Sequence, residues 1–165
     1  MSYEYTRATV TPANKRYLGG LPFSLARRPS GGHASGPRLV LVHGTPTLDT
    51  LYWTQDRSDE FCIKMAAGAG LKTGDMIAFG HTHKPWHREI EGMHFGNTGS
   101  VGRPTDGKSH AGYVRVEFAN GVVVEHVRVP YDVESTVPGV RAAGLPDDFV
   151  ECLRSGVAPA ATSSA

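Results

Sequence analysis

The chain has 165 residues, of which 39% are hydrophobic and 20% charged, values that suit one soluble globular domain. A formal net charge of +1 excludes a strong general attraction to nucleic acid, so no nucleic-acid partner is expected. No apolar run reaches the roughly 18 residues of a membrane helix, and the N-terminus does not resemble a signal peptide. Cys62 and Cys152 are far apart in the sequence and form no metal-type pair. We therefore expect free thiols, no membrane partner and a cytoplasmic location.

The sequence of the first half of the chain predicts a helix followed by a strand–helix–strand unit. The expected elements are a helix from Thr11 to Gly19, an extended segment over 21–25, a loop over 27–37, a strand over 38–43, a helix from Ser58 to Gly68 or Gly70, and a strand over 75–80. The segment 38–43 is a continuous apolar run, which is typical of a strand covered on both faces. Strand–helix–strand units usually form parallel pairs, so the strands 38–43 and 75–80 should be parallel neighbours.

The second half predicts shorter connections between strands. Strands are expected over 87–90, 93–95, 113–118 and 122–129, a weak helix capped by Asp132 and interrupted by Pro138, and a final helix from Pro146 to Gly156. Glu91–Gly92 and Asn120–Gly121 lie where tight hairpin turns belong, and Asn-Gly is the stronger signal for a type I′ turn. Residues 1–156 would then form the folded portion, and the Ala/Ser/Thr-rich residues 157–165 a disordered tail.

Three histidines follow the two predicted parallel strands. His43 ends the first strand, and His81 and His83 come directly after the second. Ligands of open α/β sheets bind at this carboxyl edge, where three neutral imidazoles could hold zinc, manganese, iron or nickel. On the alternative interpretation, a His-x-His pair in a strand only places two rings on one face of the sheet.

The sequence motifs that contain these histidines are more specific than the spacing of the histidines. The segments His43–Pro46, Gly80–Pro85 and Asn97–Pro104, in this order, closely resemble the calcineurin-like metallophosphoesterases, especially small bacterial phosphodiesterases and phosphatases. The resemblance covers most of the chain. It implies an α/β fold that is part of a four-layer αββα sandwich with mixed sheets.

The resemblance also implies roles for individual residues. His43 and His81 would bind one metal ion and His83 a second, while Asn97, Ser100 and Arg103 would lie near the substrate. On the alternative interpretation, the Asn97–Gly102 turn is a glycine-rich connection and Arg103 a surface charge.

The front of the family pattern is missing. Residues 1–48 contain no aspartate, so the Asp-x-His, Gly-Asp and Gly-Asn-His-Asp motifs, which supply the carboxylate ligands in the family, do not occur ahead of His43 in their family order. Residues 11–25 resemble the family segment that follows Gly-Asn-His-Asp. The chain is therefore expected to be the C-terminal portion of such a domain, without its N-terminal strands. It would supply the histidine side of a dinuclear site, hold at most one metal ion weakly, and be inactive or weakly active alone.

Three hypotheses follow for the whole protein. As an enzyme component, the chain would hydrolyse a phosphate mono- or diester through metal-activated water, together with an N-terminal fragment or in a homo-oligomer. As a non-catalytic module, it would act through protein–protein interaction. Alternatively, the start of the chain is misplaced and the gene encodes a whole enzyme. A serine hydrolase is excluded because Ser100 lacks the Gly-x-Ser-x-Gly context.

Overall fold

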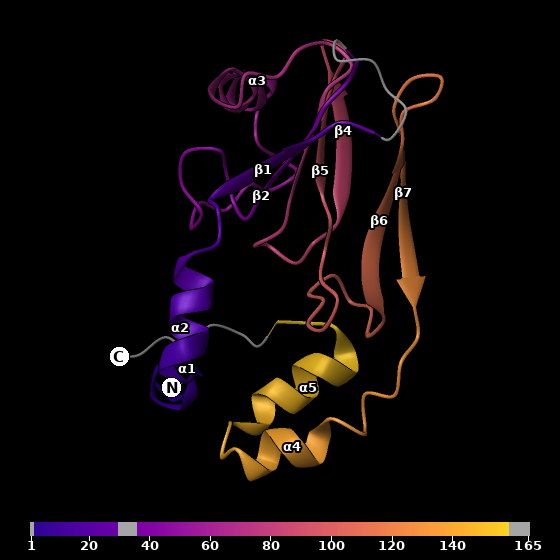
Figure 1. Ribbon diagram of the computed structural model, residues 1–165. Helices are drawn as coiled ribbons and strands as arrows, with labels where there is room; N and C mark the ends of the chain where they lie inside the picture. Colours follow the sequence, from indigo (N-terminus) through magenta and orange to yellow (C-terminus); the bar gives the residue numbers. More distant parts are fainter. Residues whose placement is uncertain (1, 30–35, 159–165) are drawn as a thin grey trace.

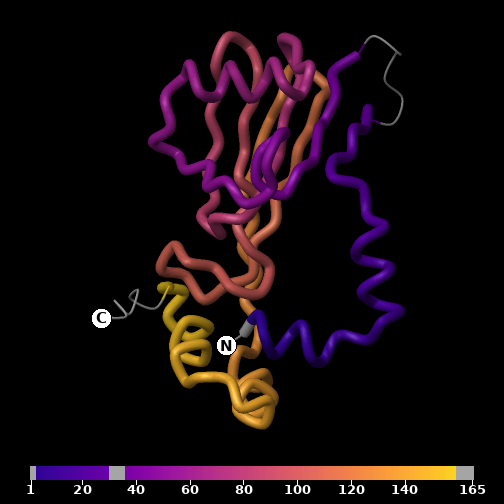
Figure 2. The backbone as a smooth tube through the Cα atoms, turned by 90° about the vertical axis from the view of Figure 1, so that its left-hand side faces the viewer, coloured from indigo at the N-terminus to yellow at the C-terminus, as the bar shows by residue number. Residues whose placement is uncertain are grey.

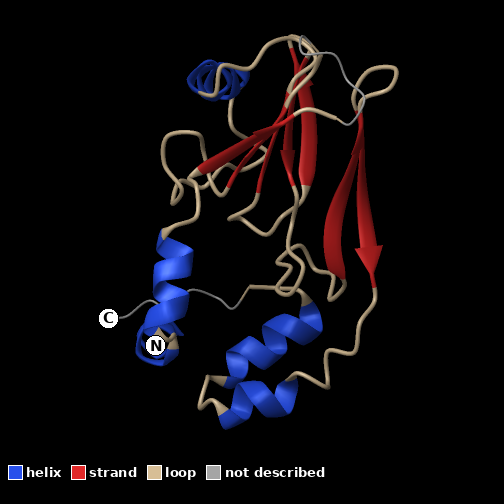
Figure 3. Ribbon diagram, in the orientation of Figure 1, coloured by secondary structure: helices blue, strands red, loops and turns tan. Residues whose placement is uncertain are grey.

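The computed structural model describes residues 2–29 and 36–158 (Figures 1 and 3). Its elements are α1 (Ser2–Thr9), α2 (Pro12–Gly19), β1 (Ser24–Arg27), β2 (Leu39–Val42), α3 (Asp59–Gly68), β3 (Met76–Phe79), β4 (Trp86–Ile90), β5 (Met93–Asn97), β6 (Ala111–Glu117), β7 (Val123–Val129), α4 (Val137–Ala142) and α5 (Asp147–Ser155). No helix among the described residues is long and apolar enough to cross a membrane.

The first sheet has five strands in the order β1-β2-β3-β5-β4. β2 pairs in parallel with β3, and β3 in parallel with β5, while β1 and β4 run antiparallel to their neighbours. The predicted parallel pair is therefore confirmed, and the carboxyl ends of β2, β3 and β5 meet at one edge. The register that pairs Leu41 with Ala78 places the residues after both strands next to each other.

The hydrophobic core lies between this sheet and α3. Trp53, from the loop between β2 and α3, is fully buried and stacks on Phe79 with a centroid distance of 4.3 Å. Trp86 and Phe95 complete the aromatic cluster from β4 and β5. Ser58 caps α3 by accepting a hydrogen bond from the backbone N–H of Phe61, as its position before two acidic residues predicts. Burial of these rings fixes the strands whose ends carry the histidines.

The second sheet, β6-β7, lies on the other side of the five-stranded sheet from α3 (Figure 1). α4 and α5 follow it in the chain and lie below both sheets in this view. The mixed α/β fold with a mixed sheet and a second sheet is the arrangement that the resemblance implies.

The two hairpin predictions have different outcomes. Glu91 and Gly92 have φ values of +53° and +71° and link β4 to β5 in a two-residue turn, as predicted. The type I′ prediction at Asn120–Gly121 is wrong. The register pairs Glu117 with Val123, so the connection spans five residues, and Gly121 alone within it has a positive φ.

Two helix predictions also need correction. Pro138 lies in the first turn of α4 and so begins that helix rather than interrupting it, because the first turn requires no backbone N–H donors. Asp132 caps a turn instead: its carboxylate accepts a hydrogen bond from the backbone N–H of Ser135. α1 was not predicted. Of the predicted tail, residues 157–158 are irregular and 159–165 lie outside the described residues, as do 30–35 of the predicted loop.

In the N-terminal segment, α1 and α2 run along the outside of the molecule, away from the sheets (Figure 2), and β1 then joins the edge of the first sheet. α2 has no buried residue, and all four residues of β1 are exposed. Several large apolar side chains are consequently open to solvent: Tyr17 (69% exposed), Leu18 (55%), Leu21 (51%), Phe23 (53%) and Leu25 (38%). These side chains together are called the uncovered apolar surface of the N-terminal segment.

Candidate metal centre

The fold brings His43 and His81 together at the carboxyl edge of the first sheet. The backbone N–H of Gly80 donates a hydrogen bond to the carbonyl of His43, which joins the two chain segments directly after β2 and β3. The Nε2 atom of His43 then lies 3.1 Å from the Nδ1 atom of His81. Convergence of these two histidines at one edge follows from the parallel pairing that the sequence predicts.

The chain turns sharply after His43. A Cβ atom on Gly44 would lie 2.4 Å from the carbonyl oxygen of Asp49, so the backbone returns more closely than any side chain there would permit. Thr45 closes this turn through hydrogen bonds to Leu48. This turn places the carbonyl oxygen of Thr50 3.1 Å from the Nε2 atom of His81.

Both histidines of the Gly80–His83 segment, the histidine loop, have an unusual backbone. His81 and His83 have φ values of +65° and +60°, in the left-handed region that residues with a side chain rarely adopt. Each such residue costs about 1–3 kcal/mol, and such conformations cluster at functional sites. The sequence gives no signal for this strain, which the surrounding hydrogen bonds must hold.

Asn97 provides much of that restraint. Its fully buried amide donates from Nδ2 to the carbonyl of Gly80 (2.6 Å) and to Oγ1 of Thr82 (3.0 Å), while its Oδ1 accepts from the backbone N–H of Gly99 (2.9 Å). Thr105 adds a hydrogen bond from Oγ1 to the carbonyl of Thr82. The residue between the two strained histidines is thus fixed from two sides.

Hydrogen bonds to carbonyls define the tautomers of two rings. A carbonyl only accepts, so Nε2 of His81 carries the proton directed at Thr50, and Nδ1 of His83 carries the proton directed at Arg103, 2.7 Å away. The lone pairs are then at Nδ1 of His81 and Nε2 of His83. Orientation of a ring by a carbonyl on its other nitrogen is the usual arrangement around metal-binding histidines.

The separation of the first two rings fits a shared ion. Imidazole nitrogens bound to one zinc ion at about 2.0–2.1 Å lie roughly 3–3.5 Å apart, and the Nε2 of His43 and the Nδ1 of His81 are 3.1 Å apart. Among residues 2–29 and 36–158, however, no group of three or more His, Cys, Asp or Glu side chains could hold a metal ion. The described residues therefore fit part of a coordination sphere.

A pocket of about 330 Å³ adjoins the histidine loop. Lys84 and Arg103 give it positive charge, and Tyr52, whose ring centroid lies 4.4 Å from that of His81, forms part of its wall. Arg103 also lies over the ring of Phe149 at 5.1 Å. Tyr52 was not identified from the sequence, because the loop that carries it has no recognisable motif.

The three predicted substrate-binding residues occupy different places. Arg103 lines the pocket, and Ser100 supports it by accepting a hydrogen bond at Oγ from the backbone N–H of Arg103 (2.9 Å). Asn97 is buried, and its amide is engaged within the chain, so the described contacts give it a positioning role. Substrate contact by these residues stays a prediction.

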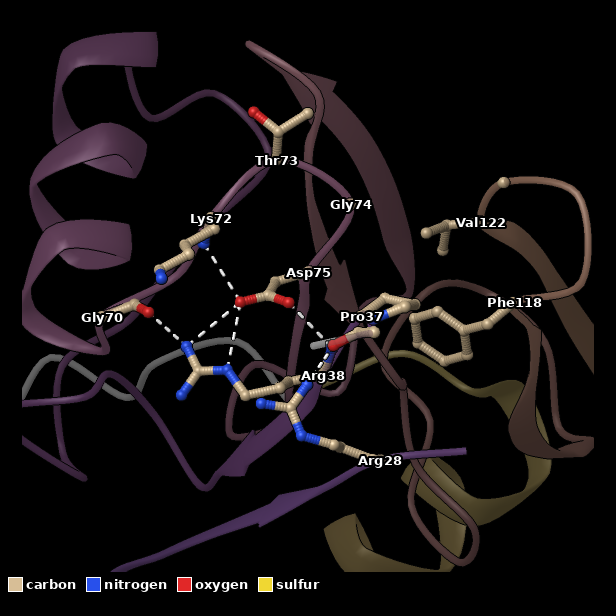
Figure 4. A pocket seen from close by; sticks show the side chains of 12 residues that line it. Arg28, Pro37, Arg38, Gly70, Lys72, Thr73, Gly74, Asp75, Phe118 and Val122 are labelled. Carbon is tan, nitrogen blue, oxygen red and sulfur yellow. Dashed lines mark hydrogen bonds and ion pairs between the residues drawn. The ribbon is translucent and has the colours of Figure 1, made fainter. Parts of the chain in front are cut away.

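A larger pocket of about 610 Å³ lies at the opposite, amino ends of β2 and β3 (Figure 4). Its acid, Asp75, is 4% exposed and accepts hydrogen bonds from the backbone N–H of Arg38 (2.7 Å) and Lys72 (3.0 Å) and from the Arg38 guanidinium (3.1 Å). These groups satisfy one another and join the start of β2 to the start of β3. The smaller pocket beside the histidines is therefore the better candidate for chemistry.

Residues 29–121 match the model of the calcineurin-like phosphoesterase superfamily domain, which is more than half of the chain. The chain belongs to this superfamily. At the level of the family, membership supports a metal-dependent phosphoesterase role and thus the class of hydrolases.

One relative and two solved structures are similar to most of the chain. The chain is 25% identical over 167 residues to an uncharacterized protein of Methanocaldococcus jannaschii, covering 92% of this chain and 63% of that protein. A metallophosphoesterase from Sphaerobacter thermophilus has the same fold, with a TM-score of 0.72, 23% identity, and coverage of 95% of this chain and 66% of its own. A hypothetical protein from Pyrococcus horikoshii has a TM-score of 0.71 at 17% identity, with coverage of 87% and 54%. The chain thus spans less than two thirds of the length of each relative.

Proposed function

We propose that this chain supplies the histidine side of a two-metal site that hydrolyses phosphate mono- or diesters. The observation that carries the proposal is the convergence of His43 and His81, 3.1 Å apart, with the other nitrogen of His81 held by a backbone carbonyl. Superfamily membership supports the reaction class.

The chain's own residues have distinct tasks in this proposal. His43 through Nε2 and His81 through Nδ1 would hold one ion, and His83 through Nε2 would hold the other. The ions, chosen from manganese, zinc, iron or nickel, would bind phosphate oxygens and lower the pKa of water. Lys84 and Arg103 would attract and orient the anionic ester, since both line the adjoining pocket.

Charge explains why the histidines alone are insufficient. Two dications about 3.5–4 Å apart repel strongly, and a bridging carboxylate is needed to hold them. Neutral imidazoles carry no negative charge, and the described residues place no carboxylate cluster with them. We infer that the carboxylate ligands are supplied by a complementing N-terminal segment that is outside this sequence. A second copy of the chain is the alternative source. Alone, the chain would hold at most one ion weakly.

The uncovered apolar surface supports this inference. Leu18, Phe23 and Leu25 are 38–55% exposed, and burying such side chains against a complementing segment would be favourable by about 25 cal/mol for each Å². The two buried free cysteines, Cys62 and Cys152, support a reducing compartment such as the cytoplasm.

Complementation tests the proposal. The chain should be mixed with, or fused to, the part of the Sphaerobacter thermophilus protein that this chain does not match, in the presence of Mn²⁺. Release of nitrophenol from bis-nitrophenyl phosphate is expected, and it should be lost when His81 and His83 are both replaced by Ala. Absence of turnover, with the complementing segment bound, would contradict the proposal.

The exposed apolar surface also favours a second candidate, a non-catalytic module that acts through protein–protein contact. In that case Leu18→Asp with Phe23→Asp would abolish association with the complementing segment, while His81→Ala with His83→Ala would leave association unchanged and no turnover would appear. Turnover that depends on the histidines would exclude this candidate.

A further inference from the structure

Besides the contacts with His43 and Thr50, the histidine loop is held by residues 97–106, which we call the bridging segment. Toward the loop, Asn97 binds Gly80 and Thr82, and the carbonyl of Arg103 accepts from Nδ1 of His83 at 2.7 Å. The loop conformation, with its two left-handed histidines, therefore depends on where the bridging segment lies.

The other side of the bridging segment contacts the second sheet. The Nε2–H of His126, in β7, donates to the carbonyl of Asn97 (3.0 Å), and the backbone N–H of Gly112, in β6, donates to the carbonyl of Ser100 (2.9 Å). Arg128 of β7 forms an ion pair with Asp106. The first of these contacts acts on the same residue whose amide fixes the histidine loop.

We propose that His126 is a positioning residue that couples the second sheet to the histidine loop through Asn97. This role rests on the proposed function in so far as the loop binds a metal ion, but the coupling itself is a property of the fold. His126 donates to the backbone of Asn97, and the side chain of Asn97 holds the carbonyl of Gly80 and the hydroxyl of Thr82. The second sheet would thus set the geometry of His81 and His83 without touching either ring.

The strain of the loop makes such support necessary. His81 and His83 have a left-handed backbone, which is strained for residues with a side chain. A displacement of Asn97 should therefore let the loop relax toward another conformation. Loss of one hydrogen bond is worth about 0.5–1.5 kcal/mol. If that loss falls wholly on the metal-binding conformation, the affinity should decrease by about twofold to tenfold.

Three variants of the full chain separate positioning from general destabilisation. His126→Phe keeps a ring but removes the donor, whereas His126→Gln retains an amide N–H that can reach the same carbonyl. His110→Ala is the matched control, because His110 is exposed directly before β6 and its side chain makes none of the described hydrogen bonds. The readouts are the ¹⁵N shifts of the imidazole nitrogens of His81 and His83, and the affinity for Zn²⁺ by calorimetry.

We expect His126→Phe to shift the nitrogen signals of His81 and His83 and to lower zinc affinity by about twofold to tenfold. His126→Gln should restore both, and His110→Ala should change neither. Unchanged signals in a folded His126→Phe variant would overturn the proposal.

Two further outcomes are informative. If the unaltered chain binds no Zn²⁺ but its histidine signals respond to His126→Phe, the metal proposal fails and the coupling stands. If His126→Phe does not fold, the tautomer of His126 in the unaltered chain is measured from its ¹⁵N shifts instead. A proton at Nε2 is expected. A proton at Nδ1 alone would overturn the coupling, because no donor would then face the carbonyl of Asn97.

Discussion

Replacing Asn97 by alanine removes three hydrogen bonds from the histidine loop and its neighbouring turn in one step. The amide is fully buried and contacts Gly80 and Thr82 through Nδ2 and Gly99 through Oδ1, at 2.6–3.0 Å. Because water does not reach the side chain, the groups left behind lose their partners without an immediate replacement.

The magnitude follows from these contacts. At a net value of about 0.5–1.5 kcal/mol for each hydrogen bond, Asn97→Ala should lower the free energy of unfolding by about 3 kcal/mol. Ser100→Ala is the matched control in the same segment. It removes one side-chain hydrogen bond, to the backbone N–H of Arg103, and should lower the free energy by about 1 kcal/mol.

Urea denaturation followed by tryptophan fluorescence measures both changes, since Trp53 and Trp86 lie in the core. The slopes of the unfolding transitions should match that of the unaltered chain, so that midpoint shifts report stability. An effect of Asn97→Ala no larger than that of Ser100→Ala would refute the role assigned to the buried amide.

Further predictions concern the core and the titrating groups. Trp53→Ala should lower the free energy of unfolding by about 3–5 kcal/mol in the same assay, because the ring is fully buried. Burial and nearby His94 and His126 lower the pKa of His87, and burial lowers that of His94, so the folded state favours the neutral rings. The free energy of unfolding should keep its full value above the unfolded pKa of about 6.5 and fall as the pH drops below it. The double variant His87→Phe with His94→Phe should make the free energy of unfolding less dependent on pH in this range. Burial raises the pKa of Cys62, so a thiol reagent should label it only after unfolding, and rapid labelling of the native chain would contradict its burial.

The sequence was sufficient to predict the edge at which the histidines meet. Strands buried on both faces are continuous apolar runs, and β2 and β3 have this pattern, so their parallel pairing and the proximity of His43 to His81 followed. The turn at Glu91–Gly92 was also predicted, because these two residues separate two predicted strands by the length of a tight hairpin, and both have positive φ in the structure.

Other features depended on contacts that a sequence pattern does not encode. The left-handed backbone of His81 and His83 is imposed by Asn97 and Thr105, residues distant in the chain. The loop at Asn120–Gly121 is long because the register of β6 and β7 already ends at Glu117 and Val123. α1 was not predicted from the sequence. Its described side chains are exposed, so the helix buries no apolar face and its sequence has no apolar periodicity to detect.

Metal titration of the 165-residue chain tests the central claim, that His43, His81 and His83 form one half of a metal site. Calorimetry with Zn²⁺ should give weak binding of at most one ion per chain, and affinity should fall as the pH is lowered through the imidazole range. His43→Ala and His81→Ala should each abolish binding, whereas the control His110→Ala should leave it unchanged. Tight, pH-insensitive binding of two ions, or binding that survives His43→Ala with His81→Ala, would contradict the account.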